Sequence, residues 1–209
     1  MRSDFRHRAR VTRRLTVPAT GAVTVDATVG AWFDVLALPV EAADDTDGGP
    51  RATRPRRQLF YTTTGLRPGP ADLAAGSRVD IEVRGETTVA WEVLGPSPPV
   101  RVGSDIEALE ATVMRVTDLY PSVADVKDTG GQTMQAAVPC AVWQTTGAAE
   151  QPRGEVAAWD GEAPPEHHAV LSAPNRRLHV GAQPLRIAQA VLHRPVPRVA
   201  MTLREATAG

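Results

Sequence analysis

Asp45, Asp47 and Gly48 form the part of the chain that comes nearest to a metal-binding motif. Their spacing is that of a calcium-binding loop, in which alternating carboxylates bind the ion and a glycine allows a sharp turn. In that register the last ligand position would be Arg54, where the loop requires a glutamate that binds calcium with both oxygens. We therefore predict a solvated acidic loop and no metal site here.

The histidines and the cysteine also lack a catalytic or metal-binding arrangement. His167 and His168 are adjacent, so on a strand they would face opposite sides and would not bind one ion together. His179 and His193 follow later, at spacings that fix no common site. Cys140 lies between apolar residues, which predicts packing as a small hydrophobe. The chain has no phosphate-binding glycine loop and no nucleophile elbow, so we expect no enzyme activity and no cofactor.

The composition is that of a soluble protein with many turns. Its 209 residues include 18 prolines and 17 glycines, which favours short strands over long helices. A net charge of −1 argues against a domain-wide basic surface for nucleic acid. Only Lys127 is a lysine among 23 basic residues, a bias that we attribute mainly to gene base composition. One cysteine and no membrane-length apolar run predict an intracellular protein without a membrane partner.

Residues 78–93 carry the clearest structural signal. Val79 and Ile81 alternate with polar residues, which is typical of a strand with one buried face. Gly85 favours a tight turn, and the alternation then resumes through Trp91. We predict a β-hairpin in this segment.

A weaker version of this hairpin recurs at residues 178–187. Each hairpin leads through a proline-containing bend to a final apolar strand, at 109–116 in the first case and 199–203 in the second. We therefore predict two β units, 1–116 and 117–209. The second is either a degenerate repeat of the first or an unrelated β domain.

Two long connections occupy the same place in the two predicted units. Residues 41–57 are rich in Gly, Pro and charge, and residues 147–166 have a similar composition. Loops of this length are usually functional or disordered. Local patterns further predict a helical turn at 104–111, a strand at 166–172, and an edge strand or a bulge at Pro139.

The elements of residues 4–116 follow one another in a characteristic order. An arginine-rich start leads into a first strand, and a Trp-containing segment ends at Leu38-Pro39 before the long loop. A strand that begins at Arg56 comes next. An Asp-Leu-x-x-Gly-x-Arg-Val segment, 72–79, then enters the hairpin, and a last strand ends the unit. In this order of elements the unit resembles the head-closure proteins of tailed bacteriophages, which are also called head-tail connectors or stoppers.

The resemblance implies a mainly β protein whose first unit is a small β-barrel. It also implies a structural role in the neck of a virion that is assembled in the host cytoplasm. There the chain would form a hexameric or dodecameric ring between the portal or adaptor protein and the tail terminator or tail-tube protein. Loops between strands would point into the channel and help to retain the packaged DNA.

Two sets of arginines are candidate contact residues in such a ring. The loop 41–57 would bring its arginines beside DNA phosphates or beside acids of the next subunit. This first set is Arg51, Arg54, Arg56 and Arg57. The N-terminal segment is either an arm that reaches an acidic partner or phosphates, or an edge strand with solvated arginines. This second set is Arg2, Arg6, Arg8 and Arg10.

Two alternatives remain open from the sequence. The hairpins suit a monomeric module of two β domains that binds a ligand or a polymer equally well, because a fold does not decide a function. Another virion component, such as a tail, baseplate or decoration protein, also fits a chain without catalytic motifs.

Overall fold

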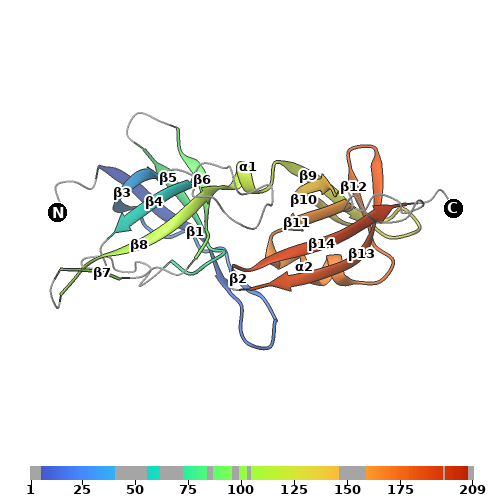
Figure 1. The fold of residues 1–209 in the computed structure, drawn as a ribbon, viewed down its shortest axis with the longest axis horizontal. Coiled ribbons are helices and arrows are strands. Elements are labelled where there is room, and N and C mark those ends of the chain that lie inside the picture. Colours follow the sequence, from blue (N-terminus) through green and yellow to red (C-terminus); the bar gives the residue numbers. More distant parts are fainter. Residues whose placement is uncertain are drawn as a thin grey trace, which may run out of the picture. The chain divides into compact units, whose positions relative to one another are not determined.

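The computed structural model of the chain is mainly β and divides into two compact units, Met1–Leu119 and Tyr120–Gly209 (Figure 1). The division falls just beyond Val116, where the sequence analysis ended the first unit. The structure describes residues 6–40, 56–61, 73–83, 87–95, 99–102, 105–145, 159–194 and 196–206.

Unit 1 contains a closed antiparallel barrel of six strands. The eight described strands of unit 1 are β1 (His7–Thr16), β2 (Thr24–Asp26), β3 (Phe33–Val40), β4 (Arg56–Tyr61), β5 (Arg78–Glu82), β6 (Val89–Val93), β7 (Pro99–Val102) and β8 (Asp105–Arg115), and six of them form the barrel. The ring runs β1-β3-β4-β8-β6-β5, and β5 pairs back to β1. Strand β2 pairs with β1 and β7 with β8, both outside the ring. The short helix α1 (Val116–Leu119) follows β8.

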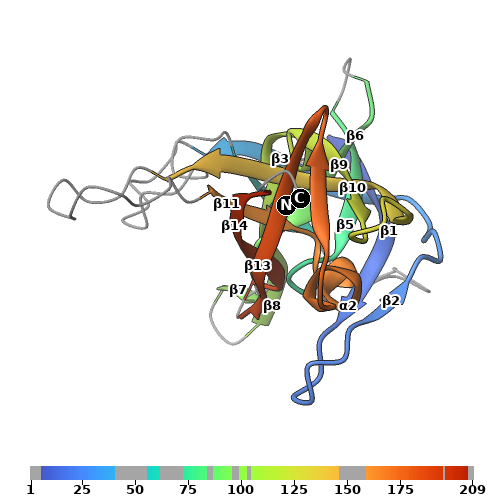
Figure 2. The same cartoon turned by 90° about the vertical axis from the view of Figure 1, so that its right-hand side faces the viewer.

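Unit 2 is a second closed barrel of six antiparallel strands. Its strands are β9 (Ser122–Lys127), β10 (Thr133–Gln144), β11 (Trp159–Ala163), β12 (Arg177–Val180), β13 (Gln183–His193) and β14 (Arg198–Glu205). The ring runs β10-β11-β14-β13-β12-β9 and closes between β9 and β10. The 3-10 turn η2 (Pro165–His167) and the helix α2 (His168–Ser172) connect β11 to β12, and α2 packs beside β13 (Figure 2).

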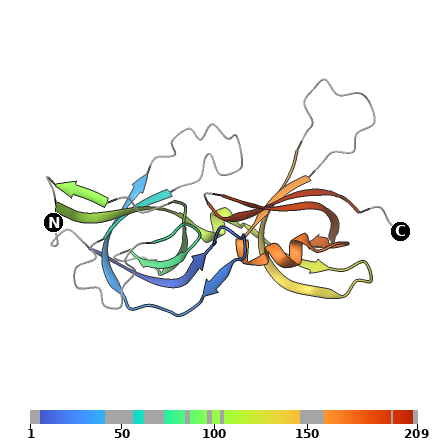
Figure 3. The ribbon, with the colours of Figure 1, turned by 90° about the horizontal axis from the view of Figure 1, so that it is seen from below.

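The curved sheets of the two units can be followed in Figure 3, and the two barrels have the same connectivity. When the ring strands of each unit are counted along the chain, both rings run first, second, third, sixth, fifth, fourth. Hairpin β5–β6 therefore matches β12–β13, and the final strand β8 matches β14. The prediction of a mainly β protein with a small barrel and a second β unit is confirmed. The shared connectivity favours a repeat over an unrelated second domain.

The predicted hairpin at 78–93 is present in unit 1. Val79 lies opposite Trp91 and Ile81 opposite Val89, so the apolar positions of both strands face the barrel interior. The turn at Gly85 lies outside the described residues. The alternation that predicted the hairpin is thus the alternation that fills the core.

Larger side chains complete the core of each barrel. In unit 1 the rings of Phe33 and Tyr61 lie 5.8 Å apart, and the Tyr61 hydroxyl accepts a hydrogen bond from the Leu73 backbone N–H at 3.0 Å. The phenol is therefore buried with its polar atom satisfied. In unit 2, Leu178 and Met201 are among the buried residues of a separate core.

Two local predictions are wrong. Residues 166–172 form η2 and α2 instead of a strand, because Pro165 at the first helical position favours a helical start. Residues 105–111 belong to β8 instead of a helical turn. Leu109 and Ala111 of that strand pair with Tyr61 and Leu59 of β4. This pairing between distant segments outweighs the local sequence pattern that had predicted a helical turn.

Pro139 lies in β10, next to a register shift. The predicted edge strand does not apply, because β10 pairs on both sides within a closed ring. The alternative prediction of a bulge is confirmed. The register shifts between Gln135 and Val138, where Ala137 has a φ of 52° and its N–H donates to Asp125 Oδ1 at 3.0 Å.

Candidate functional site

The N-terminal arginines that the structure describes lie in or beside β1. Arg6 is exposed just before the strand, whereas Arg8 and Arg10 are strand residues. Arg8 Nη2 lies 2.8 Å from Glu82 Oε2, and Arg10 Nη2 lies 2.9 Å from Asp80 Oδ2. Both acids are on the neighbouring strand β5. Arg2 lies outside the described residues.

Trp32 gives these two arginines a second partner. The guanidinium carbon of Arg10 lies 4.8 Å from the Trp32 ring centroid and that of Arg8 lies 5.3 Å from it. Both distances are within the range of cation–π attraction. Barrel 1 thus holds Arg8 and Arg10 between the face of one tryptophan and two carboxylates of β5.

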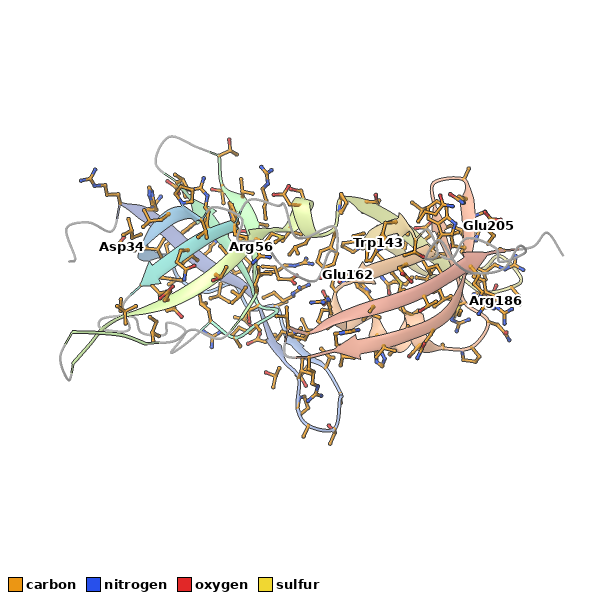
Figure 4. All side chains as sticks on the ribbon, viewed as in Figure 1. Asp34, Arg56, Trp143, Glu162, Arg186 and Glu205 are labelled. Atoms are coloured by element: carbon orange, nitrogen blue, oxygen red, sulfur yellow. The ribbon has the colours of Figure 1, made fainter. Side chains whose placement is uncertain are left out.

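The arginines of the predicted channel loop are divided between described and undescribed residues. Arg51 and Arg54 lie outside the described part of the chain. Arg56 and Arg57 are residues of β4, so they are anchored in the barrel wall instead of the loop (Figure 4). The Arg57 guanidinium carbon lies 5.4 Å from the Trp91 ring centroid. Their position in a strand therefore argues against the predicted role of Arg56 and Arg57 as residues of a channel loop.

A groove of about 350 Å³ lies on the outer face of barrel 2. We call it the Trp143 groove; the residues that matter below are Trp143, Asp160, Glu162, Val191, Arg198 and Thr202. Strand register explains why they meet. Asp160 lies opposite both Trp143 of β10 and Thr202 of β14. Met201 and Leu203 of β14 fill the interior, so Thr202 between them faces outward. Asp160 lies opposite Thr202 and therefore faces outward as well.

The two carboxylates of the Trp143 groove differ in their partners. Glu162 is only 8% exposed, and its Oε1 lies 2.7 Å from Arg198 Nε (Figure 4). The Asp160 side chain makes no hydrogen bond or ion pair within the described part of the chain. The groove therefore combines the aromatic face of Trp143, the ion pair between Glu162 and Arg198, and the Asp160 carboxylate, which has no ion-pair partner among the described residues.

This combination repeats the arginine-holding sites of barrel 1 with the arginine missing. Trp32 with Asp80 receives Arg10, whereas the Asp160 carboxylate forms no ion pair among the described residues, and Arg198 of the same groove is paired with Glu162. The Trp143 groove is therefore chemically suited to a guanidinium or ammonium group from another molecule. The sequence analysis missed this groove because Trp143 and Asp160 lie far apart along the chain. They meet only through the register between β10 and β11.

The cysteine and the paired histidines that were considered in the sequence can now be placed in the structure. Cys140 is fully buried, and burial raises the pKa of its thiol to about 11, as expected for a packing role. His167 and His168 lie at the junction of η2 and α2. Among the described residues there is no cluster of three or more potential metal ligands, and none of the helices there is long and apolar enough to span a membrane. Asp45, Asp47 and Gly48 lie outside these residues.

No family model, curated protein or solved structure matches the chain. Its function is therefore argued from the residues and geometry above.

Proposed function

We propose that the chain is a structural head-tail connector of a tailed phage, which forms a ring between the portal or adaptor and the tail. The order of elements that carries the resemblance coincides with a closed barrel in unit 1. In both units a long connection joins the second ring strand to the third, β3 to β4 and β10 to β11. Around a ring, such connections would be repeated at equivalent positions.

The observation that carries an assembly role is the Asp160 carboxylate beside Trp143, which forms no ion pair within the described residues. A contact between a groove on one copy and a cation elsewhere on the next is heterologous, and heterologous contacts generate rings when the rotation closes. Arg6 is the cation that we expect to enter it. Arg6 is exposed, lies just before the arginine-rich strand β1, and has no ion pair within the described residues.

The runner-up is a monomeric binding module. The volume of the Trp143 groove, about 350 Å³, is that of a small-ligand site, and its lining mixes aromatic and charged groups. In that role the groove would bind a small organic cation, and the chain would not assemble.

Mass photometry and negative-stain microscopy of the purified chain, alone and mixed with a portal–neck extract, separate the two. The connector predicts rings, or added density at the portal–tail junction. Asp160→Arg or Arg6→Asp would each abolish assembly, and the two changes together would restore it. Glu205→Gln, an exposed acid of unit 2 outside the groove, serves as the control. A chain that stays monomeric in both samples and binds a small cation stoichiometrically would refute the connector.

A further inference from the structure

A second surface of barrel 2 gathers four basic residues in a single row. Lys127 of β9 lies opposite Arg177 of β12, and Arg177 lies opposite Arg186 of β13. Arg186 in turn lies opposite Arg204 of β14. The four strands are neighbours in the ring, so these residues form a continuous line across the outer wall. We call this line the basic row.

No acid interrupts the basic row. Cross-strand neighbours have Cβ atoms roughly 5 Å apart, and like charges at that distance repel. Within the described part of the chain, none of the four side chains makes an ion pair or a hydrogen bond. The repulsion is therefore not compensated inside the protein.

Barrel 1 shows the opposite arrangement on its corresponding strands. There Arg8 lies opposite Asp34 of β3 on one side and Glu82 of β5 on the other. The matching hairpin β5–β6 likewise sets Arg78 opposite Glu92. Arg13 of β1 also lies opposite Arg78, but Glu92 Oε2 lies 3.8 Å from both guanidinium groups. In barrel 1 an acid thus accompanies the facing arginines, whereas no such ion pair is made by the basic row within the described part of the chain.

A hollow of about 290 Å³ adjoins the centre of the basic row and adds a further cation. Arg176 and Asn175 line it together with Arg177 and Arg186. The Nε atom of Arg176 is buried and has no hydrogen-bond partner. A buried guanidinium nitrogen without an acceptor is costly, and an oxyanion in the hollow would satisfy it.

The nearby acids do not neutralise this surface. Asp125 lies two pairs further along β9, opposite His179, and its Oδ1 already accepts the Ala137 N–H at 3.0 Å. Glu205 is paired with the inward-facing Leu185, so it is directed away from the face that carries Arg204. The row therefore presents a net positive surface on a unit of mixed charge.

We propose that the basic row and its hollow bind the phosphate backbone of nucleic acid, with duplex DNA as the ligand. Four neighbouring strands span three strand spacings, roughly 14 Å. Because the row follows half of a closed six-stranded ring, a duplex contacts the central cations Arg177 and Arg186 together with Arg176 of the hollow, and Lys127 and Arg204 flank this contact. Duplex DNA carries one charge per about 1.7 Å of axis, both strands counted, so neighbouring phosphates reach several of these cations at once, whereas a single small phosphate contacts only one or two.

This inference deepens the proposed function, because it places a DNA contact on the wall of barrel 2 instead of on the loop 41–57. It also stands apart from ring formation. A chain that remains monomeric but binds DNA through the row would refute the ring alone. A chain that forms rings but has an inert row would refute the DNA contact alone.

The test is fluorescence anisotropy of a labelled random-sequence duplex with the full-length chain over a series of salt concentrations. Wild-type protein is expected to bind, with log affinity falling linearly against log salt. The double variant Arg177→Gln/Arg186→Gln is expected to bind more weakly, with the slope reduced by about 2. The control Arg14→Gln/Arg115→Gln removes equal charge from arginines that already face Asp26 and Asp118, and its slope is expected to stay unchanged.

Thermal melts of the same samples show whether each variant is folded. Lys127→Gln provides a second, single-charge variant, with an expected loss of about 1 in slope. Absence of duplex binding at low salt, or equal losses in the row and control variants, would overturn the proposal. So would displacement of the duplex by poly-glutamate at equal charge, or binding of inorganic polyphosphate without binding of DNA.

Discussion

Arg177 of β12 lies directly opposite Arg186 of β13, in the hairpin that matches β5–β6 of the first barrel. At the matching hairpin, barrel 1 pairs Arg78 with Glu92. Opposed like charges lower the stability of a sheet, whereas opposite charges raise it. Stability alone does not explain the arginine pair, which points to a ligand that supplies the missing negative charge.

Arg186→Thr is therefore expected to stabilise the chain. The change removes a repulsive pair and introduces a β-branched residue suited to a strand, with a gain of about 0.2–1 kcal/mol in the free energy of unfolding. Urea unfolding measures it. Arg8→Thr is the matched control on β1, where loss of the pair with Glu82 should reduce stability. A loss of stability in both variants would contradict the repulsion.

His179 should titrate below its ordinary pKa of 6.5, because partial burial and the charges of Lys127 and Arg177 disfavour its protonated form, while Asp125 opposes them weakly. On β13, uncharged Pro184 faces it. Between the two pKa values the unfolded chain binds the extra proton. Stability from neutral His179 is therefore present above pH 6.5 and lost as the pH falls toward the folded pKa.

An NMR titration of the His179 ring measures this shift. Lys127→Gln should raise the pKa of His179, and saturation of the basic row with DNA should raise it further, because each change removes or offsets positive charge. Asp125→Asn should lower it. A pKa that stays the same in Lys127→Gln would contradict the electrostatic coupling between β9 and β12.

The sequence predicted the parts of the fold that depend on neighbours along the chain. The hairpin at 78–93 was predictable because the period-2 pattern and the glycine turn lie in one segment. The segment that became α2 was misassigned, because a short apolar run does not distinguish a strand from a helix. The deciding residue was Pro165, at the helical start.

Both candidate surfaces were beyond sequence reasoning for a physical reason. The basic row takes one residue from each of four strands, and a one-residue slip in any register would turn that residue to the opposite face. Trp143 and Asp160 likewise meet only because β10 pairs with β11. Lys127, the only lysine of the chain, stood out in the sequence, but the scarcity of lysine was attributed to gene base composition and not to a basic surface.

Gly161→Ala should destabilise unit 2. A Cβ at this inward-facing position would lie 2.9 Å from the Ala141 carbonyl oxygen and 3.1 Å from Met201 Cε. Backbone does not yield easily, so we expect a loss of about 1–3 kcal/mol from overpacking. Thermal unfolding of Gly95→Ala, where an added Cβ meets nothing within 4 Å, gives the control. Equal melting temperatures for the two variants would show that the barrel adapts.

Cys140 should be inert in the folded chain. Burial raises the pKa of its thiol to about 11, and thiolate is the reactive form. A thiolate-specific chromogenic reagent at mildly alkaline pH should label the protein only after denaturant is added. Because the chain has a single cysteine, any labelling reports this residue alone. Fast labelling without denaturant would mean that barrel 2 opens on the timescale of the assay.

Glu92 should be the most sensitive charged residue of barrel 1. Its side chain is 1% exposed, and its Oε2 lies 3.8 Å from both Arg13 Nη2 and Arg78 Nε. Neutralising one member of a buried ionic group leaves the others uncompensated, at a cost of about 3–5 kcal/mol. Glu92→Gln keeps the shape and removes the charge, so urea unfolding of this variant measures that cost. Glu82→Gln removes an exposed partner of Arg8 and should cost about 1 kcal/mol or less. If the two variants lost equal stability, the arginines around Glu92 would have to be neutralised by other groups.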